Sequence, residues 1–163
     1  APFSKPGYLQ EDPTLPGTIM SYTEVEFLLA DAVERGYSVG GTAEEHYNAG
    51  VTNSIMEWGG SADDAAAYLA QADVAYATAP GTWKEKIGLQ KWLAMYDMGF
   101  EAWCTYKVYD APELNLAVDN PIPTPKRYTY PVTEFSLNGE NVEAAGAAIG
   151  GDALDTPVFW DVN

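Results

Sequence analysis

The chain has 163 residues, which is enough for one domain with a hydrophobic core. Its 24 acidic and 8 basic residues give a formal net charge of -16 that is spread along the whole chain, and this argues against nucleic acid as a partner because phosphates would be repelled. The sequence contains no apolar run of about 18 residues, the length needed to span a bilayer. Residues 1–20 lack the features of a signal peptide. The single cysteine, Cys104, excludes an internal disulfide. The protein is therefore either cytosolic or exported by a signal outside this sequence.

The first predicted helix follows a proline-rich start. Residues 1–20 carry four prolines among polar residues, which predicts an extended lead-in. Over 21–36 every local signal favours a helix, because Ser21 and Glu24 match a capping box and Gly36 can end the helix. Its buried face is predicted to be Tyr22, Val25, Leu29, Ala32 and Val33, and its wetter face to be Glu24, Glu26, Asp31 and Glu34.

A second helix is predicted after a short loop. Thr42 and Glu45 match another capping box, and Gly59 marks the end of the pattern. The predicted buried positions are Tyr47, Val51, Ile55 and Trp58. Because the connection is short, the two helices are expected to pack as an antiparallel hairpin of the size found in tetratricopeptide repeats.

Two further helices are predicted in the middle of the chain. Ser61 caps an alanine-rich helix over 62–72, and Thr82 caps the longest helical pattern. The apolar face of that long helix is predicted to be Leu89, Trp92, Leu93, Tyr96, Phe100 and Trp103. We expect it to be the most buried helix, with Gly88 and Gly99 marking close crossings with other helices.

The pattern changes after Tyr109, where five prolines between positions 112 and 131 forbid a continuous helix. Residues 120–131 predict an extended strap over the surface. A short turn over 133–137 and a helix near 140–149 follow. The tail ends in Phe159 and Trp160, which we expect to be docked on the rest of the protein.

Short motifs occur in a fixed order from Pro13 to Trp160. They are Ile19-Met20-Ser21-Tyr22, Glu24-Val25, Leu28-Leu29-Ala30, Arg35-Gly36, Tyr47, Gly50-Val51, Ile87, Gln90-Lys91-Trp92-Leu93-Ala94, Glu101-Ala102-Trp103, Pro112, Ile122-Pro123, Arg127, Tyr130-Pro131, Glu134, Asn138 and Asn141. In this order they resemble the C-terminal part of the SusD/RagB family, the surface glycan-binding lipoproteins of Bacteroidetes nutrient-uptake systems. The chain departs from the family at Tyr106-Lys107-Val108, where many members carry an arginine pair.

The resemblance implies an all-α, tetratricopeptide-like fold with an irregular proline-rich C-terminal strap. It implies that residues 21–163 form one helical region of a longer protein, preceded by the lead-in 1–20. The whole protein would lie at the cell outer membrane, anchored by lipid on an N-terminal cysteine that this chain does not contain. Its partners would be a glycan, a TonB-dependent transporter and the missing N-terminal part, and it would carry out no chemistry and need no cofactor.

A histidine and a cysteine are the candidate catalytic groups of the sequence. His46 lies beside Glu45, and a histidine with a carboxylate is the smallest general-base unit, although a lone solvated histidine on a helix is the simpler interpretation. His46 could also serve Cys104 as its base, but no spacing brings them together. A buried thiol is the expected state of Cys104.

Paired carboxylates are candidates for glycoside hydrolysis, which needs two of them held across a sugar. Asp63 and Asp64 are better explained by the start of a helix, where negative charge is favoured. Asp152 and Asp155 could equally bind calcium, but they lack the dense oxygens of a known calcium loop. The sequence has no phosphate-binding loop and no metal-spaced cluster of Cys and His. We therefore predict no catalytic residue and no metal ligand.

Aromatic residues remain as candidates for glycan binding, because sugars stack their C–H faces on aromatic rings. Trp58, Trp92 and Trp103 fall on predicted helix faces and are expected in the core. The freer candidates are Trp83, Tyr37, Tyr76 and Tyr128, each of which could instead be packing. The leading hypothesis is glycan capture and delivery to a transporter, the alternative is a helical protein-interaction scaffold without its own sugar site, and a carbohydrate-active enzyme is the least favoured.

Overall fold

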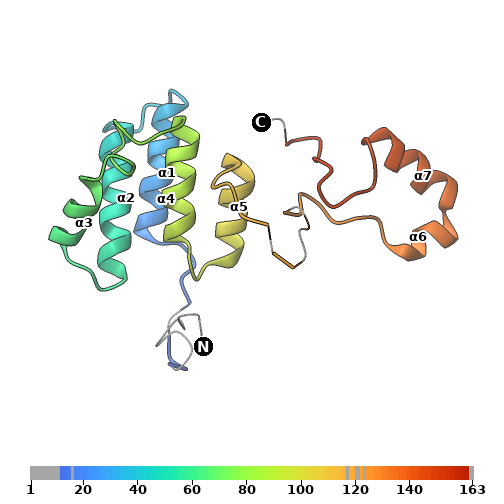
Figure 1. Cartoon of the computed structure of the whole chain (residues 1–163), viewed down its shortest axis with the longest axis horizontal. Helices are drawn as coiled ribbons and strands as arrows, with labels where there is room; N and C mark the ends of the chain where they lie inside the picture. The colour runs from blue at the N-terminus through green and yellow to red at the C-terminus, as the bar shows by residue number, and fades with distance from the viewer. Residues whose placement is uncertain (1–11, 16, 117, 120–121, 123, 162–163) are drawn as a thin grey trace.

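The computed structural model describes residues 12–15, 17–116, 118–119, 122 and 124–161. This part of the chain forms helices and contains no strand. The helices are α1 (Tyr22–Glu34), α2 (Ala43–Glu57), α3 (Ala62–Leu69), α4 (Trp83–Ala94), α5 (Gly99–Tyr109), α6 (Val132–Leu137) and α7 (Gly139–Ala148). Figure 1 shows α1 to α5 gathered in one bundle, while α6 and α7 lie at the far end of a C-terminal arm, residues 124–161. The all-α fold and the α1–α2 hairpin predicted from the sequence are confirmed.

The starts of the first four helices follow from local capping. Reciprocal capping boxes begin three of them, formed by Thr42 with Glu45, Ser61 with Asp64, and Thr82 with Glu85. At α1 only half of the predicted box forms. The Ser21 hydroxyl accepts from the backbone N–H of Glu24 at 3.1 Å, but the Glu24 side chain points to another helix instead of back to the cap.

The predicted buried face of α1 is wrong. Tyr22 is 63% exposed, whereas Glu24 and Glu26, expected on the wet side, are 3% and 6% exposed. Each buried carboxylate has a partner on a neighbouring helix. The Lys91 ammonium lies 3.4 Å from Glu24, and His46 Nδ1 lies 2.7 Å from Glu26. A buried carboxylate is tolerated when it is paired, so these partners set the rotation of α1.

The core of the bundle lies between α1, α2, α4 and the end of α5. Its buried members are Phe27, Ala30, Tyr47, Val51, Ile87, Tyr109 and Ala111. The rings of Phe27 and Tyr47 meet edge to face with centroids 6.2 Å apart. Gly50 allows this approach, because a Cβ on it would lie 3.0 Å from the Phe27 ring. Trp58, also predicted in the core, is 38% exposed.

The long helix predicted after Thr82 is broken into α4 and α5 by a turn over 95–98. The break separates its apolar positions between two helices, and most of them face outward. Leu89, Leu93, Tyr96, Phe100 and Trp103 are all at least 36% exposed. The expectation that this is the most buried helix is therefore wrong.

The two glycines of this region behave differently. A Cβ on Gly88 would lie 2.7 Å from Tyr109 Cβ and 3.1 Å from Ala111 Cβ, so Gly88 marks the close crossing of α4 with α5 that the sequence predicted. A Cβ on Gly99 would meet no atom within 4 Å. Gly99 instead begins α5, so the predicted crossing there is wrong.

The C-terminal arm keeps the predicted order of turn and helix, as α6 and α7. Residues 124–131 contain no helix, as predicted for the strap, whereas 120, 121 and 123 lie outside the described residues, as do 1–11 and 16 of the lead-in. The predicted docking of the aromatic tail is wrong, because Phe159 and Trp160 are 89% and 66% exposed. The tail is attached by charge instead: the buried Asp161 carboxylate lies 2.7 Å from Lys107 and 3.6 Å from Lys126.

We expect Gly88→Ala to lower the free energy of unfolding by about 1–3 kcal/mol, because the added methyl group would overpack the crossing with Tyr109 and Ala111. Urea unfolding of the variant and the parent measures this. The matched control is Gly99→Ala, where the methyl group meets open space and stability should stay equal or rise by less than about 1 kcal/mol. Equal effects of the two substitutions would show that the crossing is not tightly packed.

Candidate functional site

An aromatic groove lies between α5 and residues 125–128 of the C-terminal arm. Its volume is about 710 Å³, and it is lined by Gly99, Phe100, Trp103, Pro125, Lys126, Arg127, Tyr128 and Leu154. Phe100, Trp103 and Tyr128 are 88%, 40% and 94% exposed, so their rings are open to a ligand. Ligand pockets of proteins commonly have volumes of this order.

The aromatic row on α5 follows from helical spacing. Phe100, Trp103 and Tyr106 are three residues apart, which places them along one side of the helix. The rings of Trp103 and Tyr106 have centroids 5.8 Å apart. On the arm, the Arg127 guanidinium donates to Asp152 at 2.7 Å. Arg127 therefore fixes the arm, and the aromatic faces dominate the groove.

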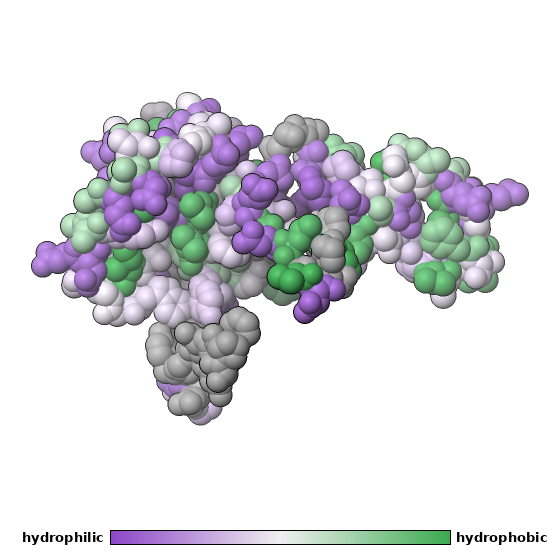
Figure 2. Space-filling view, in the orientation of Figure 1, coloured by the Kyte–Doolittle hydropathy of each residue, from purple (hydrophilic) through white to green (hydrophobic). Residues whose placement is uncertain are grey.

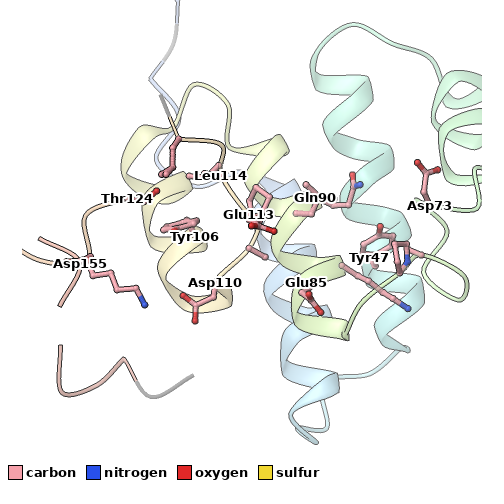
Figure 3. Close-up of a pocket in the computed structure, with 18 residues that line it drawn as sticks. Tyr47, Asp73, Glu85, Gln90, Tyr106, Asp110, Glu113, Leu114, Thr124 and Asp155 are labelled. Carbon is pink, nitrogen blue, oxygen red and sulfur yellow. The ribbon is translucent and has the colours of Figure 1, made fainter. Parts of the chain in front are cut away.

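A cleft of about 650 Å³ adjoins the groove, lined by parts of α4 and α5, by the loop after α5 and by the arm (Figure 3). Tyr106 lies at one side of the cleft and Gln90 at the other. Lys126 lines both the groove and the cleft. On the face drawn in Figure 2, apolar surface gathers between the helical bundle and the arm.

Among the charged side chains that line the cleft, the lysines and Glu85 have partners, whereas other carboxylates have none within the described residues. Lys86 donates to the Tyr76 carbonyl at 2.9 Å, and Lys126 lies 3.6 Å from Asp161. Glu85 is held in its capping box with Thr82. Four other carboxylates make no side-chain hydrogen bond or ion pair within the described part of the chain: Asp73, Asp110, Glu113 and Asp155.

Three of the four aromatic candidates predicted from the sequence belong near the C-terminal end of α1. Trp83 and Tyr76 contact residues of that end, and Tyr37 follows it closely in the chain. The Trp83 ring lies 5.5 Å from the Arg35 guanidinium. The Tyr76 hydroxyl donates to Glu34 at 2.6 Å. Tyr37, two residues after Arg35, is 67% exposed.

The fourth candidate, Tyr128, lies in the aromatic groove. Its neighbours there, Phe100 and Trp103, were missed because the spacing along α4 and α5 suggested one continuous buried helix face. The signal that could have found them is Gly99, a weak helix former just before Phe100.

A family model described as starch-binding associating with outer membrane matches residues 2–131. The chain belongs to the SusD-like family. This confirms the resemblance drawn from the sequence. A search of the curated proteins gave no match.

Solved structures of SusD-like proteins are similar to the chain. A Bacteroidetes SusD-like protein, AC2a, is 26% identical with a TM-score of 0.70, over 91% of this chain and 31% of its own. A chitin-binding SusD homologue from Flavobacterium johnsoniae is 30% identical with a TM-score of 0.64, over 89% of this chain and 36% of its own. A SusD-like protein from Bacteroides thetaiotaomicron is 26% identical with a TM-score of 0.65, over 94% and 39%. The chain therefore spans between about a third and two fifths of the length of these relatives.

The histidine of this SusD-like chain is not a free base. His46 was predicted to be solvated, but its Nδ1 lies 2.7 Å from Glu26 and its Nε2 lies 2.8 Å from the carbonyl oxygen of Gly40. Both ring nitrogens face acceptors, which favours the doubly protonated ring. Cys104, predicted to be a buried thiol, is exposed on α5 instead, because the break before α5 turns it outward.

One carboxylate of each pair that was a candidate for hydrolysis has a structural partner. Asp64 closes the capping box of α3, as its position at a helix start predicted. Asp152 accepts from Arg127 at 2.7 Å and from the backbone N–H of Tyr130 at 3.1 Å. In the described residues, no group of three His, Cys, Asp or Glu could hold a metal ion, and no helix has the length and apolar character needed to cross a membrane.

Hydrogen bonds between α1 and α2 shift two pKa values. The bond to Glu26, helped by the Gly40 carbonyl and by the nearby charge of Glu45, raises the pKa of His46 above its ordinary value. Burial would raise the pKa of Glu26, but hydrogen bonds from Tyr22 and His46 outweigh it and hold that pKa below its ordinary value. Both shifts favour the charged forms, a protonated His46 and an ionised Glu26.

We expect the stability that His46 contributes to be lost as pH rises. A histidine with a raised folded pKa stabilises fully below its unfolded pKa of about 6.5 and loses that contribution as pH passes through the folded value. Urea unfolding between about pH 5.5 and about pH 8.5 should therefore show falling stability. His46 is the single histidine, so His46→Gln should flatten the profile. A parent profile that is already flat would contradict the charged pair.

Proposed function

We propose that this SusD-like chain binds an oligosaccharide at the cell surface and that the protein delivers it to a TonB-dependent outer-membrane transporter without hydrolysing it. The match to a starch-binding family supports this proposal, as does the similarity to a chitin-binding homologue. The observation that carries it is the aromatic groove with its three exposed rings.

The chemistry of the groove suits a sugar. The C–H faces of a pyranose ring stack on exposed aromatic rings, and each buried aromatic ring contributes a large apolar contact. The Tyr128 hydroxyl and the Lys126 ammonium can hydrogen-bond to sugar hydroxyls at the rim. Because the carboxylates of Asp64 and Asp152 serve caps and arm contacts, we propose capture without bond cleavage.

The four aromatic candidates take different parts in this proposal. Tyr128, with 94% of its surface exposed, is the first contact of the glycan. Tyr37, Tyr76 and Trp83 form a second candidate surface at the end of α1. Within it Tyr37 has the freest ring, because Trp83 lies against Arg35 and the Tyr76 hydroxyl is held by Glu34.

A second candidate function, a helical scaffold for protein contacts, is favoured by α6. This helix has no buried residue, and Val132 and Leu137 are 83% and 84% exposed. An apolar helix face of this kind suits a protein partner. We propose that it packs on the transporter or on another part of the same lipid-anchored protein, beside the sugar-binding role.

We expect Tyr128→Ala and Trp103→Ala each to weaken glycan binding about tenfold, which corresponds to about 1.4 kcal/mol. The physical reason is the loss of one stacking ring from the groove. Calorimetric titration of the purified chain with starch, chitin and plant oligosaccharides measures the affinity, and a reducing-sugar assay of the same samples should detect no release.

Phe159→Ala is the matched control, because Phe159 is 89% exposed but does not line the groove. Its affinity should equal that of the parent. If Tyr37→Ala lowers the affinity and Tyr128→Ala does not, the sugar surface lies at the end of α1. Saturable binding that no aromatic substitution changes would remove the groove from the proposal, and release of reducing ends would replace capture with hydrolysis.

A further inference from the structure

We propose that Asp161 is a positioning residue of the aromatic groove: it holds the C-terminal arm against α5, so that the two halves of the groove lie together, and it does so without lining the groove. This inference rests on the proposed function, since the groove is the proposed glycan site. It goes beyond that function because it names a residue that controls glycan binding from outside the site. Asp161 acts through its contacts with Lys107 and Lys126.

The groove is divided between two parts of the chain. Phe100 and Trp103 belong to α5, whereas Tyr128 and Leu154 belong to the arm. The rings of Phe100 and Tyr128 are 88% and 94% exposed, so they bury little surface that could hold the two parts together. Among the helices of the described chain, α6 and α7 contact only each other. The groove therefore needs another contact to keep the arm beside α5.

An ion pair between Lys107 of α5 and Asp161 of the arm supplies such a contact. Figure 1 shows the segment after α7 returning toward α5, and near its end the Asp161 carboxylate lies 2.7 Å from the Lys107 ammonium. The Asp161 side chain is 3% exposed and that of Lys107 is 15% exposed. Charge-assisted hydrogen bonds of this length are strong, and breaking a buried pair leaves a charge without compensation. The pair therefore favours the arm in its docked position.

The Asp161 carboxylate is shared between α5 and the part of the arm that carries Tyr128. The Oδ2 atom that accepts from Lys107 also lies 3.6 Å from the ammonium of Lys126. The hydrogen bond from Lys107 and the charges of both lysines hold the pKa of Asp161 below its ordinary value, against the effect of burial. This shift favours the ionised carboxylate, which pairs with a cation from each of the two parts.

Backbone hydrogen bonds within the arm extend this attachment to the groove. The N–H groups of Lys126 and Arg127 both donate to the carbonyl oxygen of Leu154, at 2.6 and 3.2 Å. The Arg127 side chain also donates to Asp152 at 2.7 Å. The two residues before Tyr128 are thus fastened to the tail of the arm. A shift of that tail on α5 therefore moves Tyr128 as well.

The anchor on α5 lies on the same side of the helix as the groove. Lys107 follows Trp103 by four residues, which is about one helical turn. The Trp103 ring is 40% exposed and lines the groove. The contact at Lys107 thus holds the arm about one turn away from a proposed stacking ring. Because Asp161 does not line the groove, its effect on binding is transmitted through the position of the arm.

Asp161→Asn and Lys107→Met test this role, because each removes one charge of the pair with little change of shape. Affinity falls in proportion to the fraction of molecules in which the groove is assembled, so an arm docked in about a tenth of them binds about tenfold more weakly. We expect this loss for hexamers of glucose or of N-acetylglucosamine in calorimetric titration of the purified chain. Lys107→Arg keeps the charge and should bind within about twofold of the parent.

The double variant tests whether the two residues act as one contact. Since both substitutions break the same pair, Asp161→Asn with Lys107→Met should bind no more than about twofold more weakly than either single variant. Independent effects would multiply to about a hundredfold loss, which would contradict the shared contact. The control, Glu140→Gln, removes one charge from α7, does not line the groove and should leave the affinity unchanged.

The position of the arm can be measured directly with spin labels. Cys104 is the single cysteine and is exposed on α5, so a label on it reports from that helix. A second label is introduced through Glu143→Cys, at an exposed position of α7. Electron–electron double resonance between the labels should give a narrow distance distribution in the otherwise unchanged chain and with Lys107→Arg, and a broader one with Asp161→Asn.

The outcomes distinguish this inference from the proposed function. If the parent binds a hexamer but Asp161→Asn changes neither the affinity nor the distances, the groove binds sugar and the positioning role is overturned. A change in one of the two measurements without the other also overturns it, because position and affinity should change together. If no hexamer binds the parent, the proposed function fails for these sugars. The distances then decide the rest, since an unchanged distribution would show that Asp161 does not hold the arm.

Discussion

The bundle depends on the buried ion pair between Glu24 of α1 and Lys91 of α4. The two side chains are 5% and 7% exposed, and their charged atoms lie 3.4 Å apart. Removal of either partner would leave a buried charge without compensation, which commonly costs about 3–5 kcal/mol. Together with the contact between Glu26 and His46, this pair ties one face of α1 to both α4 and α2. The Glu24–Lys91 pair favours burial of this side of α1 and fixes the position of α4 relative to α1.

The placement of α4 is transmitted to the candidate site through α5. Gly88 brings α4 against Tyr109 and Ala111, so the last turn of α5 is fixed at the core. The first turns of α5 then carry Phe100 and Trp103 outward toward the C-terminal arm, where residues 125–128 complete the groove. A rigid packed crossing thus supports an exposed aromatic surface, which is the arrangement expected when binding residues are held by a stable scaffold.

Local features of the fold could be predicted from the sequence, and features that depend on distant partners could not. Capping boxes such as Thr42 with Glu45 involve residues three apart, so the pattern alone located the helix starts. The burial of Glu24 depends on Lys91, 67 positions away, and no periodicity shows that contact. Tyr128 was selected as a free aromatic residue of the strap, but its groove exists only because α5 lies beside the arm.

The basic residues of this strongly acidic chain act mainly inside the structure. Within the described residues their contacts include Arg35 with Asp31, Lys86 with the Tyr76 carbonyl, Lys91 with Glu24, Lys107 and Lys126 with Asp161, and Arg127 with Asp152. Because these contacts pair the basic side chains with groups inside the fold, the excess acidic side chains remain at the surface, where water solvates their charge. The net negative charge of the chain's surface is therefore partly a consequence of how the helices and the arm are held together. Cations that could neutralise this charge are held by contacts within the fold, so they offset little of it at the surface.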